Sequence, residues 1–176
     1  MTRYEIHESA QLQKDQQAAL GQFIVKNFEK APEVFGAYLC EQWAERAWGT
    51  VPSIFHYAAY SEANELIGQQ SAFRLSVPSN RVVFGLGDLV VKKEHRNEKI
   101  GKSLIEKAVT ETKKRGAQVL CTRTVKVASV FSSLGFHLDS EGRHFHDEYG
   151  RTLDDLWVWL KPGKEHTSES LHPSEF

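Results

Sequence analysis

The spacing of hydrophobic residues changes several times along the chain, and each change predicts a new element of secondary structure. Apolar residues recur with helical period over residues 10–28, 32–48, 100–114 and 127–134. Alternating or continuous apolar runs, typical of strands, occupy residues 3–7, 53–60, 65–77, 82–91, 118–124, 137–138 and 153–160. Pro32 is suited to open a helix and Gly116 to end one. The pattern predicts one mixed α/β domain over residues 1–161, followed by a polar C-terminal tail over residues 162–176.

The stretch 82–114 joins an apolar strand to a long amphipathic helix through a basic turn. Lys99 and Lys102 stand at the start of this helix, where the helix dipole favours anions over cations. Their placement is explained if an anion such as a phosphate binds the free N–H groups of the first turn. Gly101 would let that anion approach the backbone closely. From charge alone, a solvated basic surface is an equal alternative.

The same stretch carries a family resemblance. Leu89-Val90-Val91, followed by the run from Arg96 to Gly101, resembles the acyl-CoA-binding signature of the GNAT family of N-acetyltransferases. In that family a strand leads to Arg/Gln-x-x-Gly-x-Gly/Ala at a helix start. Arg96, Ile100 and Gly101 match this signature, whereas Lys99 stands where the first glycine usually stands.

The order of elements over residues 3–161 also resembles the GNAT family. This resemblance implies a twisted mixed sheet with helices on both faces. The sheet of the family separates between its fourth and fifth strands, here residues 82–91 and 118–124, and the acyl-pantetheine arm inserts into that gap. Gly85 and Gly87 agree with a distorted fourth strand, because glycine inside a strand marks a bulge or a close backbone approach.

The resemblance further implies acetyl-CoA as the cofactor and assigns residues to it. Backbone N–H groups around Leu89, Val90 and Val91 would hold the acyl and pantetheine groups. The pyrophosphate would bind the loop made of Arg96, Asn97, Glu98, Lys99, Ile100, Gly101, Lys102 and Ser103. Lys92 and Lys93 are candidates for the terminal phosphate, or they are solvated.

The proton donor usual in the family is replaced in this chain. Phe131 stands where many members have a tyrosine, so it is interpreted as core or pantetheine packing. Three explanations stay open: Ser129 or Ser132 donates instead, the thiolate leaves unaided, or catalysis is impaired.

Asp88 is the candidate catalytic base, acting directly or through water. It lies in an otherwise apolar strand, where an unpaired carboxylate is costly and usually has a partner or a function. An ion pair with a neighbouring arginine, or a side chain turned to solvent, explains it equally well.

The acceptor is predicted to be a primary amine of a small molecule. The stretch from Leu89 to Phe136, followed by Asp154-Asp155, is remotely similar to aminoglycoside 2′-N-acetyltransferases. This similarity would draw a site for a cationic aminosugar from Glu41, Glu45, Asp147, Glu148, Asp154 and Asp155. Ordinary solvation is the alternative explanation for these acidic side chains. A protein or peptide amine is the alternative acceptor, and a catalytically degenerate CoA-binding module is the non-enzymatic alternative.

The composition limits the kinds of partner that the protein is expected to bind. A net charge of −1 with a local basic cluster gives no indication of nucleic-acid binding, and no apolar run approaches the roughly 20 residues of a membrane span. Cys40 and Cys121 are expected to be reduced core thiols of a cytoplasmic protein. His144 and His146, although near Asp147 and Glu148, are not expected to bind a metal. The last strands and the tail are candidates for a homodimer interface.

Overall fold

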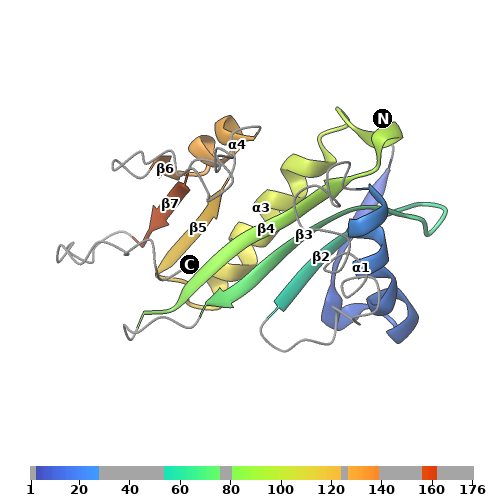
Figure 1. Ribbon diagram of the computed structural model, residues 1–176, viewed down its shortest axis with the longest axis horizontal. Helices are drawn as coiled ribbons and strands as arrows, with labels where there is room; N and C mark the ends of the chain where they lie inside the picture. The colour runs from blue at the N-terminus through green and yellow to red at the C-terminus, as the bar shows by residue number, and fades with distance from the viewer. Residues whose placement is uncertain (1–2, 28–53, 76–80, 124–126, 139–155, 162–176) are drawn as a thin grey trace, which may run out of the picture.

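The computed structural model describes residues 3–27, 54–75, 81–123, 127–138 and 156–161. The strands are β1 (Tyr4–Glu8), β2 (Ile54–Ser61), β3 (Leu66–Leu75), β4 (Val83–Val91), β5 (Val119–Arg123), β6 (His137–Leu138) and β7 (Leu156–Leu160). The helices are α1 (Lys14–Asn27), α3 (Ile100–Lys114) and α4 (Ala128–Ser133), with short 3-10 turns at Ser9–Gln11 and Lys93–His95. The strands form one sheet in the order β1-β2-β3-β4-β5-β7-β6. Figure 1 shows α1 in front of this sheet and α3 behind it.

The predicted order of elements is confirmed wherever the structure describes the chain, and so is the mixed α/β fold. The predicted helix over residues 32–48 lies outside the described residues. The first helix begins at Lys14 rather than near Ala10. The reason is a 3-10 turn before it, in which the Gln11 side chain accepts a hydrogen bond from the Glu8 backbone N–H and fixes a separate bend.

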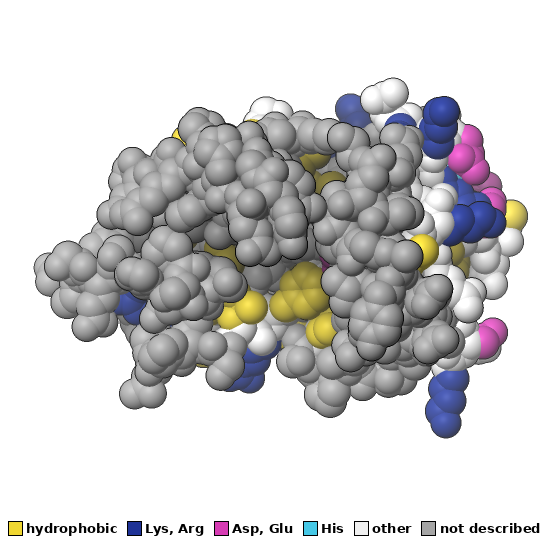
Figure 2. Space-filling view, in the orientation of Figure 1, with side chains coloured by type: hydrophobic (Ala, Val, Ile, Leu, Met, Phe, Trp, Pro, Cys, Tyr) yellow, Lys and Arg dark blue, Asp and Glu magenta, His cyan; other side chains and the backbone are white. Residues whose placement is uncertain are grey.

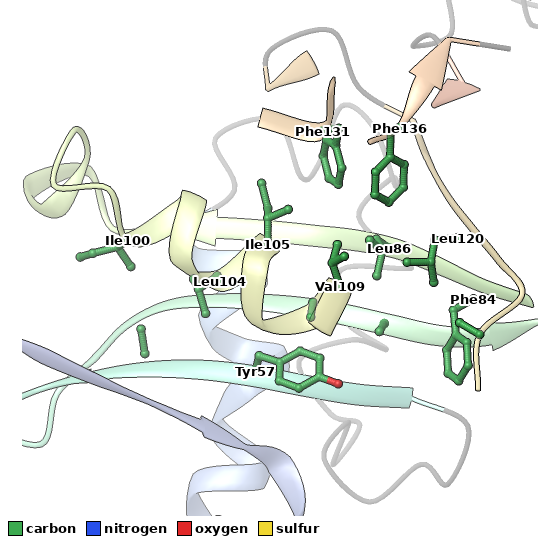
Figure 3. Packing of buried hydrophobic residues seen from close by; sticks show 14 of the residues in the cluster. Tyr57, Phe84, Leu86, Ile100, Leu104, Ile105, Val109, Leu120, Phe131 and Phe136 are labelled. Atoms are coloured by element: carbon green, nitrogen blue, oxygen red, sulfur yellow. The ribbon is translucent and has the colours of Figure 1, made fainter. Parts of the chain in front are cut away.

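The main hydrophobic core lies between α3 and the sheet. Leu104, Ile105 and Val109 of α3 are almost fully buried against residues of β2, β4 and β5 (Figure 3). Burying a side chain of this size contributes about 1.5–3 kcal/mol. The helix ends where Gly116 adopts a φ of 84°, the left-handed conformation that glycine accepts readily, so the predicted helix end is confirmed.

The opposite face of the sheet is covered differently. Leu20 of α1 packs with Ala58 and Tyr60 of β2, while Ile24 packs with Val90 of β4. The same face also carries buried polar side chains: His56 of β2 alternates with Ala58, and Ser71 and Gln69 of β3 pair with these two residues. In the view of Figure 2, hydrophobic side chains of described residues are visible in a hollow near the middle of this face.

The sheet separates along β4. β4 and β5 are parallel and pair only from Val83–Val119 to Leu86–Thr122, although β4 continues to Val91. At the last pair the Thr122 hydroxyl donates to the Leu86 carbonyl oxygen at 2.9 Å. The expected separation between the fourth and fifth strands is therefore present, and the residues beyond Leu86 have β3 as a neighbour but no longer β5. Among the described residues, no helix is long and apolar enough to cross a membrane.

Candidate active site

A β-bulge marks the point where β4 leaves β5. Gln69 pairs with Val90 and Ser71 pairs with Gly87, so Gln70 alone faces two residues of β4, Asp88 and Leu89. The residue that absorbs the distortion is Asp88, with a φ of 54°. Aspartate is among the few residues that tolerate this left-handed conformation. The sequence therefore predicted a distorted strand correctly, but it pointed to the glycines instead of to Asp88.

Gly87 has a different reason to be small. A Cβ atom built on Gly87 would lie 3.1 Å from Cε2 of Phe73, closer than side chains normally pack. The glycine therefore allows the ring on β3 to lie close to the backbone of β4.

Side-chain amides hold the bulge. The Gln69 Nε2 donates to the Asp88 carbonyl oxygen at 2.6 Å, and the Gln70 Nε2 donates to the Gly87 carbonyl oxygen at 2.6 Å. Together with the Thr122 bond to Leu86, three consecutive carbonyl groups of β4 accept hydrogen bonds from side chains. A backbone that departs from the regular ladder must satisfy its polar groups in another way, and these side chains do so.

The sequence alone does not single out these supporting residues. Gln69, Gln70 and Ser71 are buried and consecutive in β3, and His56 is buried on the neighbouring β2. The available signal was a polar run inside a strand that is otherwise apolar, which is costly unless each group is paired.

Asp88 is the titratable group of the bulge. Burial raises the pKa of its carboxyl from 3.8 to about 6, and a hydrogen bond from Ser71 opposes that rise. Neither an arginine partner nor full exposure explains this carboxylate, because its partner is the Ser71 hydroxyl and its side chain is only partly accessible. At neutral pH the carboxyl is mostly ionised and close enough to its pKa to exchange a proton readily.

A loop with two left-handed residues precedes α3. Asn97 has a φ of 69° and Lys99, the N-cap of α3, has a φ of 66°. A positive φ explains why the family prefers glycine at the position of Lys99, since a lysine there costs about 1–2 kcal/mol. Arg96 ties the loop to the end of β4, because its Nε donates to the Val91 carbonyl oxygen at 3.2 Å.

The start of α3 has the properties of an anion site. All residues of its first turn are among those that the structure describes, and none of them is acidic. Its N-cap residue, Lys99, makes no side-chain capping hydrogen bond. The first N–H groups of a helix have no partner within the helix and carry partial positive charge. Gly101 is not required by packing of the protein, because a Cβ there would lie 3.7 Å from Cγ2 of Val91, an ordinary contact. The residues present therefore fit a pyrophosphate group.

Other residues assigned to the cofactor have partners within the protein. The Ser103 hydroxyl accepts a hydrogen bond from the Tyr4 hydroxyl at 2.9 Å. Lys92 forms an ion pair with Glu65 and lowers the pKa of that carboxyl, whereas Lys93 is exposed. Lys93 is thus the better placed of the two lysines to interact with a further phosphate.

Phe131 belongs to the hydrophobic core. Its side chain is 2% exposed, and its ring centroid lies 5.1 Å from that of Phe136 in an edge-to-face arrangement (Figure 3). Ser129 and Ser132, the alternative donors, are exposed residues of α4.

Several predicted residues lie outside the described part of the chain. They are the acidic residues Glu41, Glu45, Asp147, Glu148, Asp154 and Asp155, together with Cys40, His144 and His146. Within the described residues, no cluster of His, Cys, Asp and Glu side chains could hold a metal ion. Cys121 is buried, and its Sγ donates a hydrogen bond to the Phe84 carbonyl oxygen at 3.6 Å.

A mixed sheet that separates between two parallel strands, with the inner strand leading through a basic loop into a long helix, is the fold of acyl-CoA N-acyltransferases. A family model described as an acetyltransferase (GNAT) domain matches residues 12–147. Since this match spans most of the sequence, the chain belongs to the GNAT acetyltransferase family. It is accordingly an acyltransferase, and acetyl-CoA is its acyl donor.

Solved structures support the fold. A putative acetyltransferase from Acinetobacter baylyi ADP1 aligns over 92% of this chain and 93% of its own, with a TM-score of 0.67 and 19% identity. A GNAT family N-acetyltransferase from Escherichia coli in complex with CoA aligns over 91% of this chain and 82% of its own, with a TM-score of 0.63 and 16% identity. An aminoglycoside acetyltransferase from an uncultured soil metagenomic sample aligns over 78% and 93%, with a TM-score of 0.56 and 22% identity. No curated protein sequence is a significant match.

Proposed function

We propose that this protein transfers the acetyl group of acetyl-CoA to a primary amine of a small molecule, with Asp88 as the base. The observation that carries the proposal is the position of Asp88. Asp88 lies in the bulge, two residues beyond Leu86, the last residue of β4 that pairs with β5, and the pKa of its carboxyl is raised to about 6. A carboxyl so placed serves a reaction at the gap between the strands.

The chemistry needs a base of this strength. As the amine nitrogen bonds to the acyl carbon, its N–H becomes strongly acidic, and the proton passes to an Asp88 carboxylate oxygen directly or through water. The carbon–sulfur bond breaks and the electron pair leaves on sulfur. A thiol has a pKa of about 8.5, far below that of an alkyl amine at about 10.4, so sulfur leaves as a thiolate without an acid. This favours unaided departure over donation by Ser129 or Ser132, and it is consistent with a phenylalanine at residue 131.

Acetyl-CoA would bind at two places, one on β4 and one at the start of α3. Backbone N–H groups of Leu89, Val90 and Val91 would bind the acyl and pantetheine portion beyond the bulge. The loop from Arg96 to Ser103 would bind the pyrophosphate at the helix start, with Lys99 adding positive charge. Acetyl-CoA supplies the activated acyl group, and the chain supplies position and a proton acceptor.

An aminoglycoside or related aminosugar is the first acceptor to test. Support comes from the sequence similarity noted above and from an aminoglycoside acetyltransferase with the same fold. The acidic residues proposed for this acceptor are Glu41, Glu45, Asp147, Glu148, Asp154 and Asp155. A peptide amine is the second candidate, and a CoA-binding module without turnover is the third.

The test is thiol release from acetyl-CoA with aminoglycosides, polyamines, amino acids and short peptides as acceptors. We expect saturable turnover with an aminosugar, lost when Glu41 and Glu45, or Asp154 and Asp155, are changed to the amides. Turnover restricted to peptides would replace the small-amine proposal. Tight CoA binding by calorimetry without turnover on any amine would favour the binding module.

The role of Asp88 is tested separately with Asp88→Asn. Asparagine tolerates the same left-handed backbone, so the bulge is preserved while the base is removed. We expect kcat/KM to fall by about 10²–10⁴-fold, the usual contribution of a general base. An unchanged kcat across pH would remove Asp88 from this role.

A further inference from the structure

A chain of hydrogen bonds links the buried side chain of His56 to Asp88. His56 of β2 is 0% exposed and pairs in register with Ser71 of β3. Its Nδ1 lies 3.1 Å from Oε1 of Gln69 and 3.0 Å from Oγ of Ser71. Ser71 pairs across the strands with Gly87, next to Asp88, and its hydroxyl is the group that lowers the pKa of the Asp88 carboxyl. The chain therefore runs from β2 through β3 to the bulge of β4.

The direction of these hydrogen bonds follows from the network. The Gln69 Nε2 donates to the Asp88 carbonyl oxygen, so Gln69 presents its oxygen to His56. Only a protonated Nδ1 can donate to that oxygen, which assigns the Nδ1–H tautomer. The Ser71 oxygen then shares this N–H as a second acceptor, because the hydroxyl proton cannot point at a protonated nitrogen. The hydroxyl proton is left to be donated to Asp88.

We infer that His56 and Ser71 are positioning residues for Asp88. His56 fixes the Ser71 oxygen, so that the hydroxyl proton points at the Asp88 carboxylate and stabilises its ionised form. Gln69 stabilises the same arrangement, because its side-chain amide hydrogen-bonds both His56 and the backbone carbonyl of Asp88. The inference rests on the proposed role of Asp88 for its catalytic meaning, although the hydrogen-bond chain can be tested without activity.

Charged groups of the surrounding elements do not explain the state of Asp88. Burial and the Ser71 hydroxyl are the influences on its pKa among the described residues. The charged residues on the packed elements α1 and β3 are Lys14, Asp15, Lys26 and Arg74, and none of them contributes. A change in the titration of Asp88 after mutation of Ser71 or His56 therefore reports on this chain of hydrogen bonds.

The experiment measures the pKa of the Asp88 carboxyl by ¹³C NMR in the full-length protein, together with the pH profile of kcat/KM. Three variants are compared with wild type: Ser71→Ala, His56→Leu and His56→Asn. Ser71→Ala removes the hydroxyl that donates to Asp88. We therefore expect the pKa of Asp88, and the apparent pKa of the acidic limb of the pH profile, to rise by about 0.5–1 unit. His56→Leu, which leaves the Ser71 oxygen unheld, should give a shift of the same sign. His56→Asn keeps an N–H near the position of Nδ1 and should restore the wild-type titration.

The outcomes distinguish the role of Asp88 as a base from its positioning by His56 and Ser71. An unchanged pKa of Asp88 in folded Ser71→Ala would overturn the inference, whatever the activity. If His56→Leu fails to fold, a Ser71→Ala shift together with a wild-type titration in His56→Asn supports it. Equal shifts in His56→Asn and Ser71→Ala would remove the N–H of His56 from the arrangement. If Asp88→Asn retains full turnover while the NMR shifts occur, the role of Asp88 as base fails and the hydrogen-bond chain stands.

Discussion

The two halves of β4 have different surroundings. From Val83 to Leu86 the strand pairs on both sides, with β3 and with β5, and its buried side chains are apolar. From Gly87 to Val91 the partner on one side is lost, a bulge appears and a carboxylate enters the strand. One strand therefore provides both rigid core and reactive edge. The rigid half fixes the position at which the irregular half begins.

The largest effect is expected in the paired half. Leu86→Ala removes a side chain that is 5% exposed in the main core, so the free energy of unfolding should fall by about 2–5 kcal/mol. Chemical denaturation gives this value directly. KM values of the protein that remains folded should stay near wild type. A loss of activity without a loss of stability would show that the two halves are not separable in this way.

The next effect concerns Asp88 and pH. Its pKa is higher in the folded protein, about 6, than the 3.8 of an ordinary aspartate, so its contribution to stability is full below pH 3.8 and is lost as pH rises through about 6. The upper limit of this loss is about 3 kcal/mol. Asp88→Asn lacks the titration, so its stability relative to wild type should increase between pH 4 and pH 7. Urea denaturation across this range measures the difference, and a constant difference would contradict the assigned pKa.

A smaller effect is expected at the start of α3. Lys99→Asn and Lys99→Gly both remove the charge and both accept the φ of 66°. Each should weaken CoA binding several-fold, with less difference at high salt because the charge is then screened. The free energy of unfolding should rise by up to about 1–2 kcal/mol, because the strain of the left-handed lysine is relieved. Calorimetry at two salt concentrations checks this, and Lys114→Gln, at the opposite end of α3, is the control for loss of a helical lysine. Unchanged affinity in both Lys99 variants would show that the lysine side chain is solvated and does not contribute to CoA binding.

The smallest effect on stability is expected at Gly101. A Cβ there makes only ordinary contacts, so Gly101→Ala should raise the free energy of unfolding by up to about 1 kcal/mol. The added methyl group would nevertheless stand where the proposed pyrophosphate meets the helix, and CoA affinity should fall. Thermal unfolding and calorimetry on the same variant measure both quantities. A variant with higher stability and undiminished affinity would place the phosphate elsewhere.

The fold was predictable because its signals are local. The helical period over 100–114 and the apolar run over 82–91 each specify one element, and Gly116 has the positive φ expected of a helix end. Within the site, the loop before α3 was also visible, since its basic residues contradict the helix dipole unless an anion binds.

The interior of the site was less predictable. Asp88 was recognised as an unusual carboxylate, but its partner Ser71 is 17 positions away in the sequence and is brought close only by pairing of β3 with β4. Register across a bulge cannot be derived from alternation, because one extra residue changes which side chains share a face. For the same reason, neither His56 nor the two glutamines can be assigned to the site from the sequence alone.

The capped carbonyl groups of β4 have a consequence for assembly. A sheet that opens along one strand presents an edge to which another extended chain can add, and such edges promote aggregation. Here the carbonyl oxygens of Leu86, Gly87 and Asp88 already accept hydrogen bonds from Thr122, Gln70 and Gln69. An added strand would need those acceptors to form a regular ladder. Within the described residues, the polar side chains that shape the bulge thus also discourage strand addition where β4 has lost β5 as its neighbour.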